Sequence, residues 1–564
     1  MEFKGIAASP GIAIGKVFAL RAVDAQPVAP SGDPATEQSR FDAALATSRA
    51  ELGALRERVA KRVGEEEAAV FDAHLMMLDD PSLTDEVAGA IAGGTDAVTA
   101  TEQVVEAIKA IFASMDDAYM RERAADVADV GRRLVRHLTG TNAPDLGAIA
   151  EPSVIIAHDL TPSDTAQLDP ATALGFATES GGRTSHSAIM ARSLGLPAVV
   201  GVPGLLSQIN DGDMLIVDGD AGLVLVNPSE LTMAAYRDKA AKLAAEREEL
   251  KALKELPATT TDGHHVEVAA NVGTPKDVAP ALANGAEGVG LYRTEFLFMD
   301  RDALPTEQEQ YEAYKAVIAG MEGRPVIIRT LDIGGDKQIP YLEMPAEMNP
   351  FLGWRALRMC LDRPDLFKTQ LRAIWRAGAH GPTRVMFPMV SSVDQVRQAK
   401  ALLEEARAEL VAEGVAVAER LEVGVMIEIP AAALIADQMA REVDFFSIGS
   451  NDLIQYTIAV DRMNQNIAHL YDPYHPGVLR LVGMVIDAAH KHGKWAGMCG
   501  EMAGDPAAIP VLLGLGLDEF SMSAGSILRA KRLIRSLSRE ACAAKAQQAL
   551  VAATSAEAKA LFQE

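Results

Sequence analysis

The chain has 564 residues, a formal net charge of −25 and a hydrophobic fraction of 49%. This length exceeds a single core and predicts about three or four domains of roughly 100–200 residues each. The acidity argues against a general nucleic-acid surface, so any basic patch must be local and specific. No stretch reaches the ~20 uninterrupted apolar residues of a membrane span. Three widely spaced cysteines form no disulfide or metal pattern, and no signal peptide is evident, so we expect a cytoplasmic protein.

The first part of the chain alternates between strand-like and helical patterns. Residues 1–20 predict short strands, whereas apolar residues recur at helical spacing from about 35 to 138. Residues 151–226 return to short strands and turns, as in an α/β domain. We expect residues 1–20 to join this domain, which makes the helical block an insertion. The expected helices are 36–62, 65–78, 83–93, 95–114 and 117–138, and the expected strands are Val154–Ala157, Leu174–Ala177, Ala198–Gly201 and Met214–Gly219.

A glycine pair, an arginine, two hydroxyls and a histidine occur together from Gly181 to His186, where a turn should give way to a helix. A helix N-terminus offers free N–H groups and partial positive charge, which attract phosphate. A neutral imidazole placed there could attack phosphorus and carry the phosphoryl group. Taken alone, the run fits better a histidine at a helix start with Ser185 as its cap. His186 becomes a candidate nucleophile only in combination with other segments.

Residues 229–255 are rich in Ala, Lys, Glu and Leu and predict a connecting helix that ends before Pro257. From about residue 260, apolar strand candidates alternate with amphipathic helices. Eight such units over about 300 residues predict a (β/α)8 TIM barrel. An open doubly wound sheet is the alternative, but no Gly-x-Gly-x-x-Gly opens the first unit. The expected strands are His265–Asn271, Gly288–Tyr292, Val326–Arg329, Arg384–Pro388, Glu422–Ile427, Phe445–Ile448 and Trp495–Met498, with a weaker one near Phe351–Trp354.

Charged and polar residues follow these apolar strands one after another. At the carboxyl ends of barrel strands, such residues face the active site. Arginine forks bind phosphate and carboxylate oxygens in bidentate geometry. The set therefore predicts a small, doubly anionic substrate, for which a phosphorylated carboxylic acid fits well. Its members are Arg293, Arg329, Asp332, Lys337, Arg355, Glu428, Asn451, Asp452, Arg462 and Cys499.

Two carboxylates of this set, Glu428 and Asp452, offer hard oxygen ligands that suit Mg²⁺. Each member also has a purely structural explanation. Glu428 could cap a helix, Asp452 could be an ordinary turn aspartate, and Arg293 could only pair with Glu295. Cys499 could be a buried apolar residue, although a loop cysteine after a strand could deliver a proton. We favour the functional interpretation because all members fall at the same end of one predicted barrel.

Four motifs, in order along nearly the whole chain, resemble the Enzyme I family of the bacterial sugar phosphotransferase system. They are Gly181–His186, Gly290–Leu297, Asn349–Arg355 and Asn451–Tyr456. The resemblance implies an Mg²⁺-dependent enzyme in which His186 takes the phosphoryl group of phosphoenolpyruvate, with release of pyruvate. His186 would then pass the group to a histidine of the carrier protein HPr, as the first step of sugar uptake. The family is also homodimeric through its barrel.

The resemblance further implies a role for each residue of the barrel set. Phosphate would be held by Arg293, Arg329 and Arg462, with Asn451 assisting and Arg355 assisting nearby. Apart from the resemblance, we expect the positive charge of Lys337 to help neutralise and position the phosphate. Glu428 and Asp452 would bind Mg²⁺, and Cys499 would protonate the enolate carbon as pyruvate forms. Thr165 would bond the second imidazole nitrogen of His186 and so set its tautomer.

The same resemblance makes the helical insertion the HPr-docking domain. Acidic side chains flanking exposed methionines suit a basic partner surface with an apolar centre, although a solvated acidic face would have the same composition. Pro81 and Ser82 replace acidic residues often seen in the family, which leaves the strength of docking open. The docking stretch contains Glu65, Glu66, His74, Met76, Met77, Asp80 and Leu83.

The expected organisation is an α/β phosphohistidine domain (1–20 and 145–228), a helical insertion (21–144), a linker helix (229–258) and a TIM barrel (259–564). Because His186 and the barrel site belong to different domains, the phosphohistidine domain must swivel between donor and acceptor. One alternative is an ATP-coupled pyruvate dikinase or phosphoenolpyruvate synthase, for which the chain is too short to add a nucleotide-binding domain. The other is a non-catalytic phosphoenolpyruvate sensor.

Overall fold

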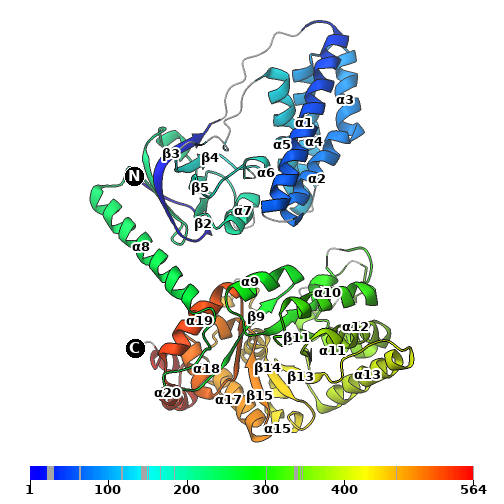
Figure 1. The fold of residues 1–564 in the computed structure, drawn as a ribbon, viewed down its shortest axis with the longest axis vertical. Helices are drawn as coiled ribbons and strands as arrows, with labels where there is room; N and C mark the ends of the chain where they lie inside the picture. The colour runs from blue at the N-terminus through cyan, green and yellow to red at the C-terminus, as the bar shows by residue number, and fades with distance from the viewer. Residues whose placement is uncertain are drawn as a thin grey trace. The chain divides into compact units, whose positions relative to one another are not determined.

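The computed structural model describes residues 1–562 except 22–30, 63–64, 116–117, 141–145, 147–148, 150, 166, 183–184, 300, 336–338, 340, 343, 346 and 465. The chain forms two compact units, Met1–Ala245 and Glu246–Glu564 (Figure 1). Within the described residues, no helix combines the length and the apolar character needed to cross a lipid bilayer.

Five helices form a block in the first unit: α1 (Pro34–Arg62), α2 (Glu65–Asp79), α3 (Pro81–Ala92), α4 (Ala97–Ala113) and α5 (Ala118–Thr139). Their apolar stripes meet in a core that includes Phe41, Phe71 and Leu134. Asp80 caps α3, which has a proline as its first residue, and Asp96 caps α4. The five expected helices are confirmed to within a few residues at each end.

Eight strands of the first unit form one mixed sheet in the order β1-β8-β7-β3-β4-β5-β6-β2. The strands are β1 (Glu2–Lys4), β2 (Ile6–Ser9), β3 (Ile12–Leu20), β4 (Ser153–Ala157), β5 (Ala173–Thr178), β6 (Ala198–Val200), β7 (Met214–Asp218) and β8 (Leu223–Val226). β3 pairs in parallel with β4, so strands before and after the helical block share one sheet. The helices are therefore inserted between two strands that are neighbours in the sheet. The sequence analysis did not predict β8.

Successive residues along a strand point to opposite faces of the sheet. Both faces of this sheet are covered by hydrophobic cores, so neighbouring residues of one strand belong to different cores. Ile155 and Phe176 lie in one core, and Val154 and Ala177 lie in the other. Short helices connect the strands: α6 (Pro162–Thr165), α7 (His186–Leu194) and η2 (Leu206–Gln208). The expected linker helix is α8 (Glu230–Ala252), and the boundary between the two units falls within it.

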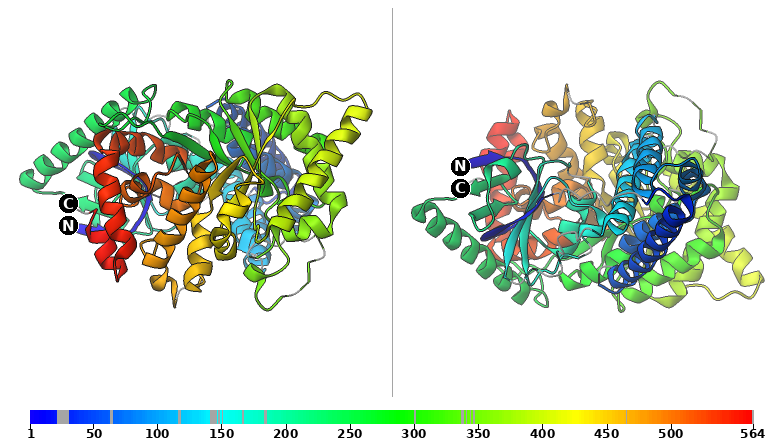
Figure 2. Two further views of the ribbon diagram at one scale, coloured as in Figure 1. Left: turned by 90° about the horizontal axis from the view of Figure 1, so that it is seen from below. Right: turned by 90° about the horizontal axis from the view of Figure 1, so that it is seen from above.

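The second unit contains a closed barrel of parallel strands, as predicted. The strands are β9 (Glu267–Val272), β10 (Val289–Arg293), β11 (Val326–Arg329), β12 (Thr383–Phe387), β13 (Glu422–Ile427), β14 (Phe445–Ile448), β15 (Trp495–Met498) and β16 (Glu519–Met522). Pairing of β16 with β9 closes the barrel. Helices surround the strands, as the left view of Figure 2 shows.

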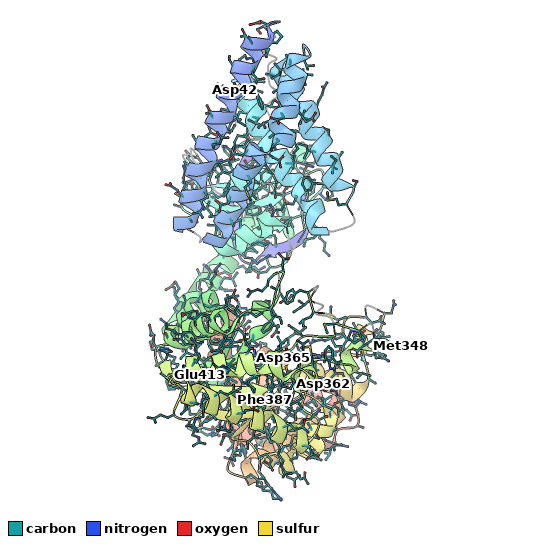
Figure 3. The ribbon with its side chains drawn as sticks, turned by 90° about the vertical axis from the view of Figure 1, so that its right-hand side faces the viewer. Asp42, Met348, Asp362, Asp365, Phe387 and Glu413 are labelled. Atoms are coloured by element: carbon teal, nitrogen blue, oxygen red, sulfur yellow. The ribbon has the colours of Figure 1, made fainter. Side chains whose placement is uncertain are left out.

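The longer surrounding helices are α9 (Val278–Ala283), α10 (Glu307–Gly320), α11 (Ala356–Asp362), α12 (Pro364–Ala377), α13 (Val393–Ala412), α16 (Ser450–Ile458), α17 (Pro476–Lys491), α18 (Ile509–Leu515), α19 (Ala524–Ser536), α20 (Arg539–Val551) and α21 (Ser555–Ala560). Shorter ones are η3 (Pro275–Asp277), η4 (Thr294–Leu297), η5 (Pro350–Leu352), η6 (Gly378–His380), α14 (Pro430–Leu434), α15 (Ala436–Met439), η7 (Ala468–Leu470) and η8 (Glu501–Gly504). Phe387 is buried where strands and helices meet, whereas Met348, between β11 and η5, is 98% exposed at the edge of the unit (Figure 3).

The eighth barrel strand differs from the prediction. The segment near Phe351–Trp354 includes the end of η5, a 3-10 turn that begins at Pro350, a residue with no N–H for a strand ladder. The eighth strand is instead β16. Two of its residues, Glu519 and Ser521, lie against Gly290 across the barrel interior. Because these inward positions are polar, β16 lacks the apolar run by which the other strands were predicted.

Candidate active site

Charged side chains gather where several barrel strands end. Arg329, the last residue of β11, is 7% exposed. Its guanidinium donates to Glu295 Oε1 at 2.6 Å and lies 3.0 Å from Asp332 Oδ2. The other oxygen of Asp332 accepts from Arg355 Nη2 at 2.8 Å. One buried aspartate therefore holds two buried arginines side by side.

The cluster continues from Arg355 to the start of α16. Arg355 Nη2 lies 3.4 Å from Asp452 Oδ2, and Arg462 Nη2 lies 3.6 Å from Asp452 Oδ1. Gly334 has a φ of +114°, and a Cβ there would lie 2.3 Å from the Cβ of Arg355. Only glycine allows the loop after β11 to pass this close to the arginine. The result is a continuous cluster of alternating positive and negative charges.

The carboxylates keep the two buried arginines charged. Burial alone would lower the pKa of Arg329, but Glu295, Asp332 and Glu428 hold it above its usual range. The pKa of Arg355 is raised in the same way by Asp332 and Asp452, against the effect of burial. The site thus retains charged arginine forks in a region from which water is largely excluded.

Glu428 and Asp452, the predicted metal ligands, lie in this cluster and are 2% and 7% exposed. Burial, Asp452 and Asp332 raise the pKa of Glu428, although Arg355 and Arg329 oppose the shift. Asp452 Oδ1 is buried and accepts no hydrogen bond within the described part of the chain. Closely spaced carboxylates with an unsatisfied oxygen fit a hard divalent cation such as Mg²⁺. Among the described residues, no cluster of three or more ligating side chains is found.

Cys499 lies just past the end of β15 and is 5% exposed. Burial raises the pKa of its thiol to about 11, although Ser447 and Arg329 partly oppose the shift. The group is therefore a neutral thiol at ordinary pH and carries a proton that it can donate. It also packs against Leu291 and Met426 of the barrel interior.

Arg293, Asn451 and Arg462 lie at the outer part of the site, where each is half-buried. The sequence alternative, in which Arg293 pairs with Glu295, is wrong because Glu295 pairs with Arg329 instead. Asn451 Oδ1 accepts from the backbone N–H of Glu501 at 3.0 Å. Lys337 lies outside the described residues.

Two residues of the cluster were not assigned a role from the sequence. Glu295 is 1% exposed and contacts Arg329, and the adjacent Thr294 donates to the carbonyl oxygen of Arg329 at 2.8 Å. Tyr456 lies 3.4 Å from Arg355 Nη1. Glu295 and Tyr456 belong to the motifs Gly290–Leu297 and Asn451–Tyr456, but only the fold shows which arginine each of them contacts.

The phosphohistidine candidate lies in the first unit. His186 is the first residue of α7, and Ser185 caps the helix by accepting from the N–H of Ala188 at 3.4 Å. Gly181 has a φ of +102°, which explains a glycine in the preceding turn. The predicted helix start is confirmed. The side chain of His186 lies outside the described part, as do Arg183 and Thr184.

Thr165 lies in a short helix that contacts α7. It ends α6, which packs against α7, and its side chain is 1% exposed. Its hydroxyl donates to the carbonyl oxygen of Thr161 at 3.1 Å. The expected bond from Thr165 to His186 therefore stays a prediction.

The predicted docking stretch spans α2 and the start of α3. Met76 is 68% exposed, Met77 is half-buried, and Asp80 is exposed at the start of α3. Glu65 and Glu66 begin α2, but their side chains lie outside the described part. The exposed methionine and acidic cap agree with the surface expected from the sequence.

Two members of the docking stretch are buried, contrary to the expectation of an exposed surface. His74 is fully buried on the side of α2 that faces α5, with Nε2 at 3.3 Å from Asp126 Oδ1. Leu83 is 4% exposed and belongs to the helical core. The sequence alone did not distinguish these two residues from their exposed neighbours, because residues within one helical turn point to both the buried and the exposed side of the helix. They can support a docking surface from within but not form it.

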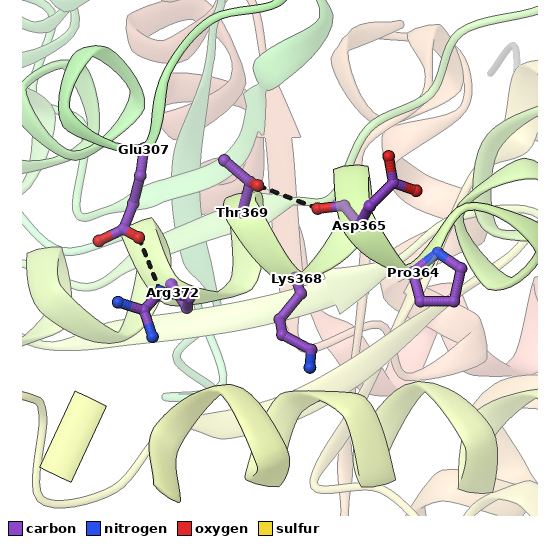
Figure 4. Close-up of a pocket in the computed structure, with 6 residues that line it drawn as sticks. All are labelled: Glu307, Pro364, Asp365, Lys368, Thr369 and Arg372. Carbon is purple, nitrogen blue, oxygen red and sulfur yellow. Dashed lines mark hydrogen bonds and ion pairs between the residues drawn. The ribbon is translucent and has the colours of Figure 1, made fainter. Parts of the chain in front are cut away.

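A surface hollow of about 460 Å³ lies over the barrel helices α10 and α12 (Figure 4). Its cations already have partners: Lys368 pairs with Glu405 and Glu409, and Arg372 pairs with Glu307 and Glu413. These ion pairs occupy both cations of the hollow. We therefore assign this hollow no part in the active site.

Comparison with known proteins places this fold and site in a defined class. Residues 4–123, 149–222 and 247–539 match the N-terminal, mobile and PEP-binding domains of PEP-utilising enzymes. The chain is 52% identical to a phosphoenolpyruvate-protein phosphotransferase of Staphylococcus carnosus, over 100% of this chain and 99% of the relative. It is 55% identical to one from Bacillus sp., over 96% and 94%. The chain belongs to the phosphoenolpyruvate-protein phosphotransferase family and is an enzyme.

A solved structure titled as the NMR solution structure of an Enzyme I protein is 42% identical, covers 43% of this chain and 99% of its own, and has a TM-score of 0.38. The identities of the relatives above confirm the resemblance found from the sequence motifs. Because those relatives match the chain over its whole length, the comparisons do not favour the ATP-coupled alternative.

Proposed function

We propose that this protein transfers the phosphoryl group of phosphoenolpyruvate to His186 and from there to a histidine of HPr, with release of pyruvate. The observation that carries the proposal is the buried cluster in which Asp332 joins Arg329 and Arg355 beside Glu428 and Asp452. Acting in the cytoplasm as a homodimer through the barrel, the protein would catalyse the first step of sugar uptake.

The arginines supply donors that an anionic substrate can use. The Nε–H groups of Arg329, Arg355 and Arg462 are buried and have no hydrogen-bond partner among the described residues. An unsatisfied buried donor costs about 1–3 kcal/mol, which an incoming phosphate or carboxylate oxygen would recover. Arg293 and Asn451 would complete the phosphate contacts at the outer part of the site, with Lys337 assisting.

The balance of charge supports Mg²⁺ as the metal. The described part of the site has four arginines (Arg293, Arg329, Arg355 and Arg462) and four carboxylates (Glu295, Asp332, Glu428 and Asp452), so these charges balance when all eight groups are ionised. A substrate with a phosphate and a carboxylate brings about three negative charges at neutral pH. Glu428 and Asp452 would hold the cation. Its positive charge would offset the negative charge of the substrate and make the phosphorus atom more electrophilic.

The reaction needs a nucleophile on one side and a proton on the other. His186 attacks phosphorus through a neutral ring nitrogen, so protonation of the imidazole removes the nucleophile. The P–O bond to the enolate breaks as the bond to nitrogen forms. Cys499 then gives its proton to the enolate carbon, which becomes the methyl group of pyruvate.

Transfer between sites requires the His186 domain to move. The carboxyl-terminal part of α8 and the segment after it are tied to α19 of the barrel unit. Arg532 donates to Glu246 of α8 at 2.6 Å, and Lys531 donates to the carbonyl oxygen of Leu256, just after α8, at 3.1 Å. We therefore place the hinge of the swivel before Glu246, and the docking surface around Met76 would receive HPr.

Labelled phosphoenolpyruvate with Mg²⁺ tests the assignment directly. We expect an acid-labile, base-stable label on the wild-type protein that moves to added HPr, and no label on His186→Ala. His158→Ala is a matched control, because His158 lies in the same unit, is exposed and pairs only with Glu179 among the described residues. This variant should label like wild type. A label that persists on His186→Ala would refute the role of His186.

A further inference from the structure

The backbone at Cys499 is held by hydrogen bonds on both sides. Its N–H donates to the carbonyl oxygen of Ile448, the last residue of β14, at 3.2 Å. Its own carbonyl oxygen accepts from Nδ2 of Asn271 in β9 at 3.0 Å. Peptide groups are planar, so fixing the two that flank the Cα atom of Cys499 also fixes the direction of its Cα–Cβ bond. Only rotation about that bond can then move the thiol.

Asn271 reaches Cys499 from a strand that is not the neighbour of β15. In the barrel, β16 lies between β9, which contains Asn271, and β15, which precedes Cys499. Ser521 of this intervening strand is fully buried, and its hydroxyl donates to Asn271 Oδ1 at 2.6 Å. Hydrogen bonds therefore join Ser521, Asn271 and Cys499 in series across three adjacent strands.

The chemistry of these three groups selects one orientation of the Asn271 amide. The carbonyl oxygen of Cys499 can only accept a hydrogen bond, so the NH2 group of the amide must face it. The amide oxygen then faces Ser521, whose hydroxyl can donate to it. Turning the amide by half a rotation would place two acceptors, Asn271 Oδ1 and the Cys499 carbonyl oxygen, against each other. Ser521 therefore stabilises the amide orientation that holds Cys499.

Two glycines make room for these contacts. A Cβ on Gly290 of β10 would lie 2.5 Å from Ser521 Oγ, so a side chain there would displace the hydroxyl. A Cβ on Gly500, the residue after Cys499, would overlap Ser450 Oγ and lie 2.7 Å from the backbone nitrogen of Ser450. Glycine at position 500 therefore lets the segment that carries the thiol pass against the start of α16.

The start of α16 holds the same segment from the other side. Asn451 Oδ1 accepts from the N–H of Glu501, two residues after Cys499, at 3.0 Å. The next residue of α16 is Asp452, one of the candidate metal ligands. The segment from Cys499 to Glu501 is thus fixed between Asn271 of β9 and Asn451 of α16, which sets the position of the thiol relative to the charged cluster.

We propose that Asn271 and Ser521 are positioning residues that orient the Cys499 thiol toward one face of the enolate. This inference rests on the proposed role of Cys499 as proton donor. In that step the S–H bond breaks, a C–H bond forms at the enolate carbon, and the remaining thiolate takes a proton from water before the next turnover. A thiol on a fixed backbone adds hydrogen to one face, whereas a loosened thiol competes with water, which can reach both faces.

Asn271→Ala removes the bond to the Cys499 carbonyl oxygen. With phosphoenolpyruvate, Mg²⁺ and HPr, we expect kcat for pyruvate release to fall by about tenfold or more, as for a displaced reacting group. Calorimetry on His186→Ala with Mg²⁺ should give the same affinity for phosphoenolpyruvate whether or not Asn271→Ala is added. A loss of affinity would mean that Asn271 binds substrate directly and would overturn the inference. Ser521→Ala should also lower kcat, and it replaces Asn271→Ala if that variant unfolds.

The methyl group of pyruvate gives a readout that a merely structural role would not change. Phosphoenolpyruvate with a single deuterium at C3 in one geometry, converted in tritiated water, gives a chiral methyl group if hydrogen adds to one face only. We expect a chiral methyl group from wild type and a largely racemic one from Asn271→Ala, with the pyruvate trapped at once as lactate. A racemic product from wild type, or a fully chiral one from Asn271→Ala, would overturn the inference.

A double-mutant cycle tests whether Asn271 acts through the thiol. Added to Cys499→Ala, Asn271→Ala should lower kcat no further, and an additive loss would overturn the inference. Asn284→Ala is the matched control, because that amide donates to the carbonyl oxygen of Pro280 at 2.9 Å at the exposed end of α9. It should leave kcat and the methyl chirality unchanged. If wild-type protein releases no pyruvate, or Cys499→Ala changes neither kcat nor chirality, the proposed function itself fails.

Discussion

Individual side chains at the barrel mouth have their charge set by immediate neighbours. Asp332 contacts both Arg329 and Arg355, and with the other carboxylates it keeps them charged despite burial. Cys499 has the opposite environment, because burial in an apolar interior favours its neutral form. Charged arginines and a neutral thiol therefore coexist in one small volume, as the proposed proton transfer to an enolate requires.

The state of Cys499 can be measured by titration. Because burial raises the pKa of its thiol to about 11, the thiolate should be nearly absent at pH 8 and increase as the pH rises toward 11. The difference in ultraviolet thiolate absorbance between wild type and Cys499→Ser, followed as the pH rises, measures the titration of the Cys499 thiol. A midpoint near the ordinary thiol value of about 8.5 would contradict the environment described.

Removing one partner of the buried ion pairs should be costly. Arg329→Met leaves Glu295 and Asp332 without their charge partner in a site where water is largely excluded. We expect the free energy of unfolding to fall by about 3–5 kcal/mol. Urea denaturation of the protein measures the change. Arg363→Met is the control, since among the described residues the Arg363 side chain pairs only with the nearby Asp365.

At the scale of single elements, loops after the strands position the site. The loop after β11 brings Gly334 against Arg355, and η5 presents Phe351 with its ring centroid 5.7 Å from the Arg355 guanidinium. A barrel supplies the strand ends, whereas its loops supply the side-chain directions. A change in one loop backbone should therefore affect binding without opening the barrel.

Gly334→Ala tests this positioning. The new Cβ would lie 2.3 Å from the Cβ of Arg355 at a φ of +114°, so both must shift. We expect kcat/KM for phosphoenolpyruvate to fall by about 10²-fold, as for a reacting group misplaced by about 1 Å. Gly525→Ala in α19 meets no atom within 4 Å and should leave kcat/KM unchanged. Steady-state kinetics of both variants distinguish the outcomes.

At the scale of the whole molecule, the two units have separate cores and separate chemistry. The barrel core begins at Ala258, whereas the helical and sheet cores end at Met233. Candidate donor residues lie in one unit, and the proposed phosphate acceptor His186 lies in the other. This division permits the swivel that the proposed function requires.

Calorimetry should therefore resolve two unfolding transitions. Phosphoenolpyruvate with Mg²⁺, added to His186→Ala so that no turnover occurs, should stabilise only the barrel transition. At 100 times the dissociation constant the expected gain is about 2.7 kcal/mol. An equal shift of both transitions would show that the units unfold together or that both bind the ligand.

Patterns of residues close together in the sequence determined the type and order of most helices and strands. Helical spacing predicted α1 to α5, apolar runs predicted β11, β13 and β14 with their observed ends, and the Gly181–His186 run predicted the start of α7. The polar strand-end residues predicted an anionic substrate before any contact was known. These features depend on residues near each other along the chain, and therefore a single sequence shows them.

Only the tertiary structure decided which distant residues meet and which faces are buried. It paired Glu295 with Arg329 in place of Arg293, buried His74 and Leu83, and formed the last strand from a segment with an inward Glu519. It also brought Asp332 between two arginines from different loops. The physical reason is that such contacts depend on how whole elements pack, and residues far apart in the chain carry no local pattern that reveals it.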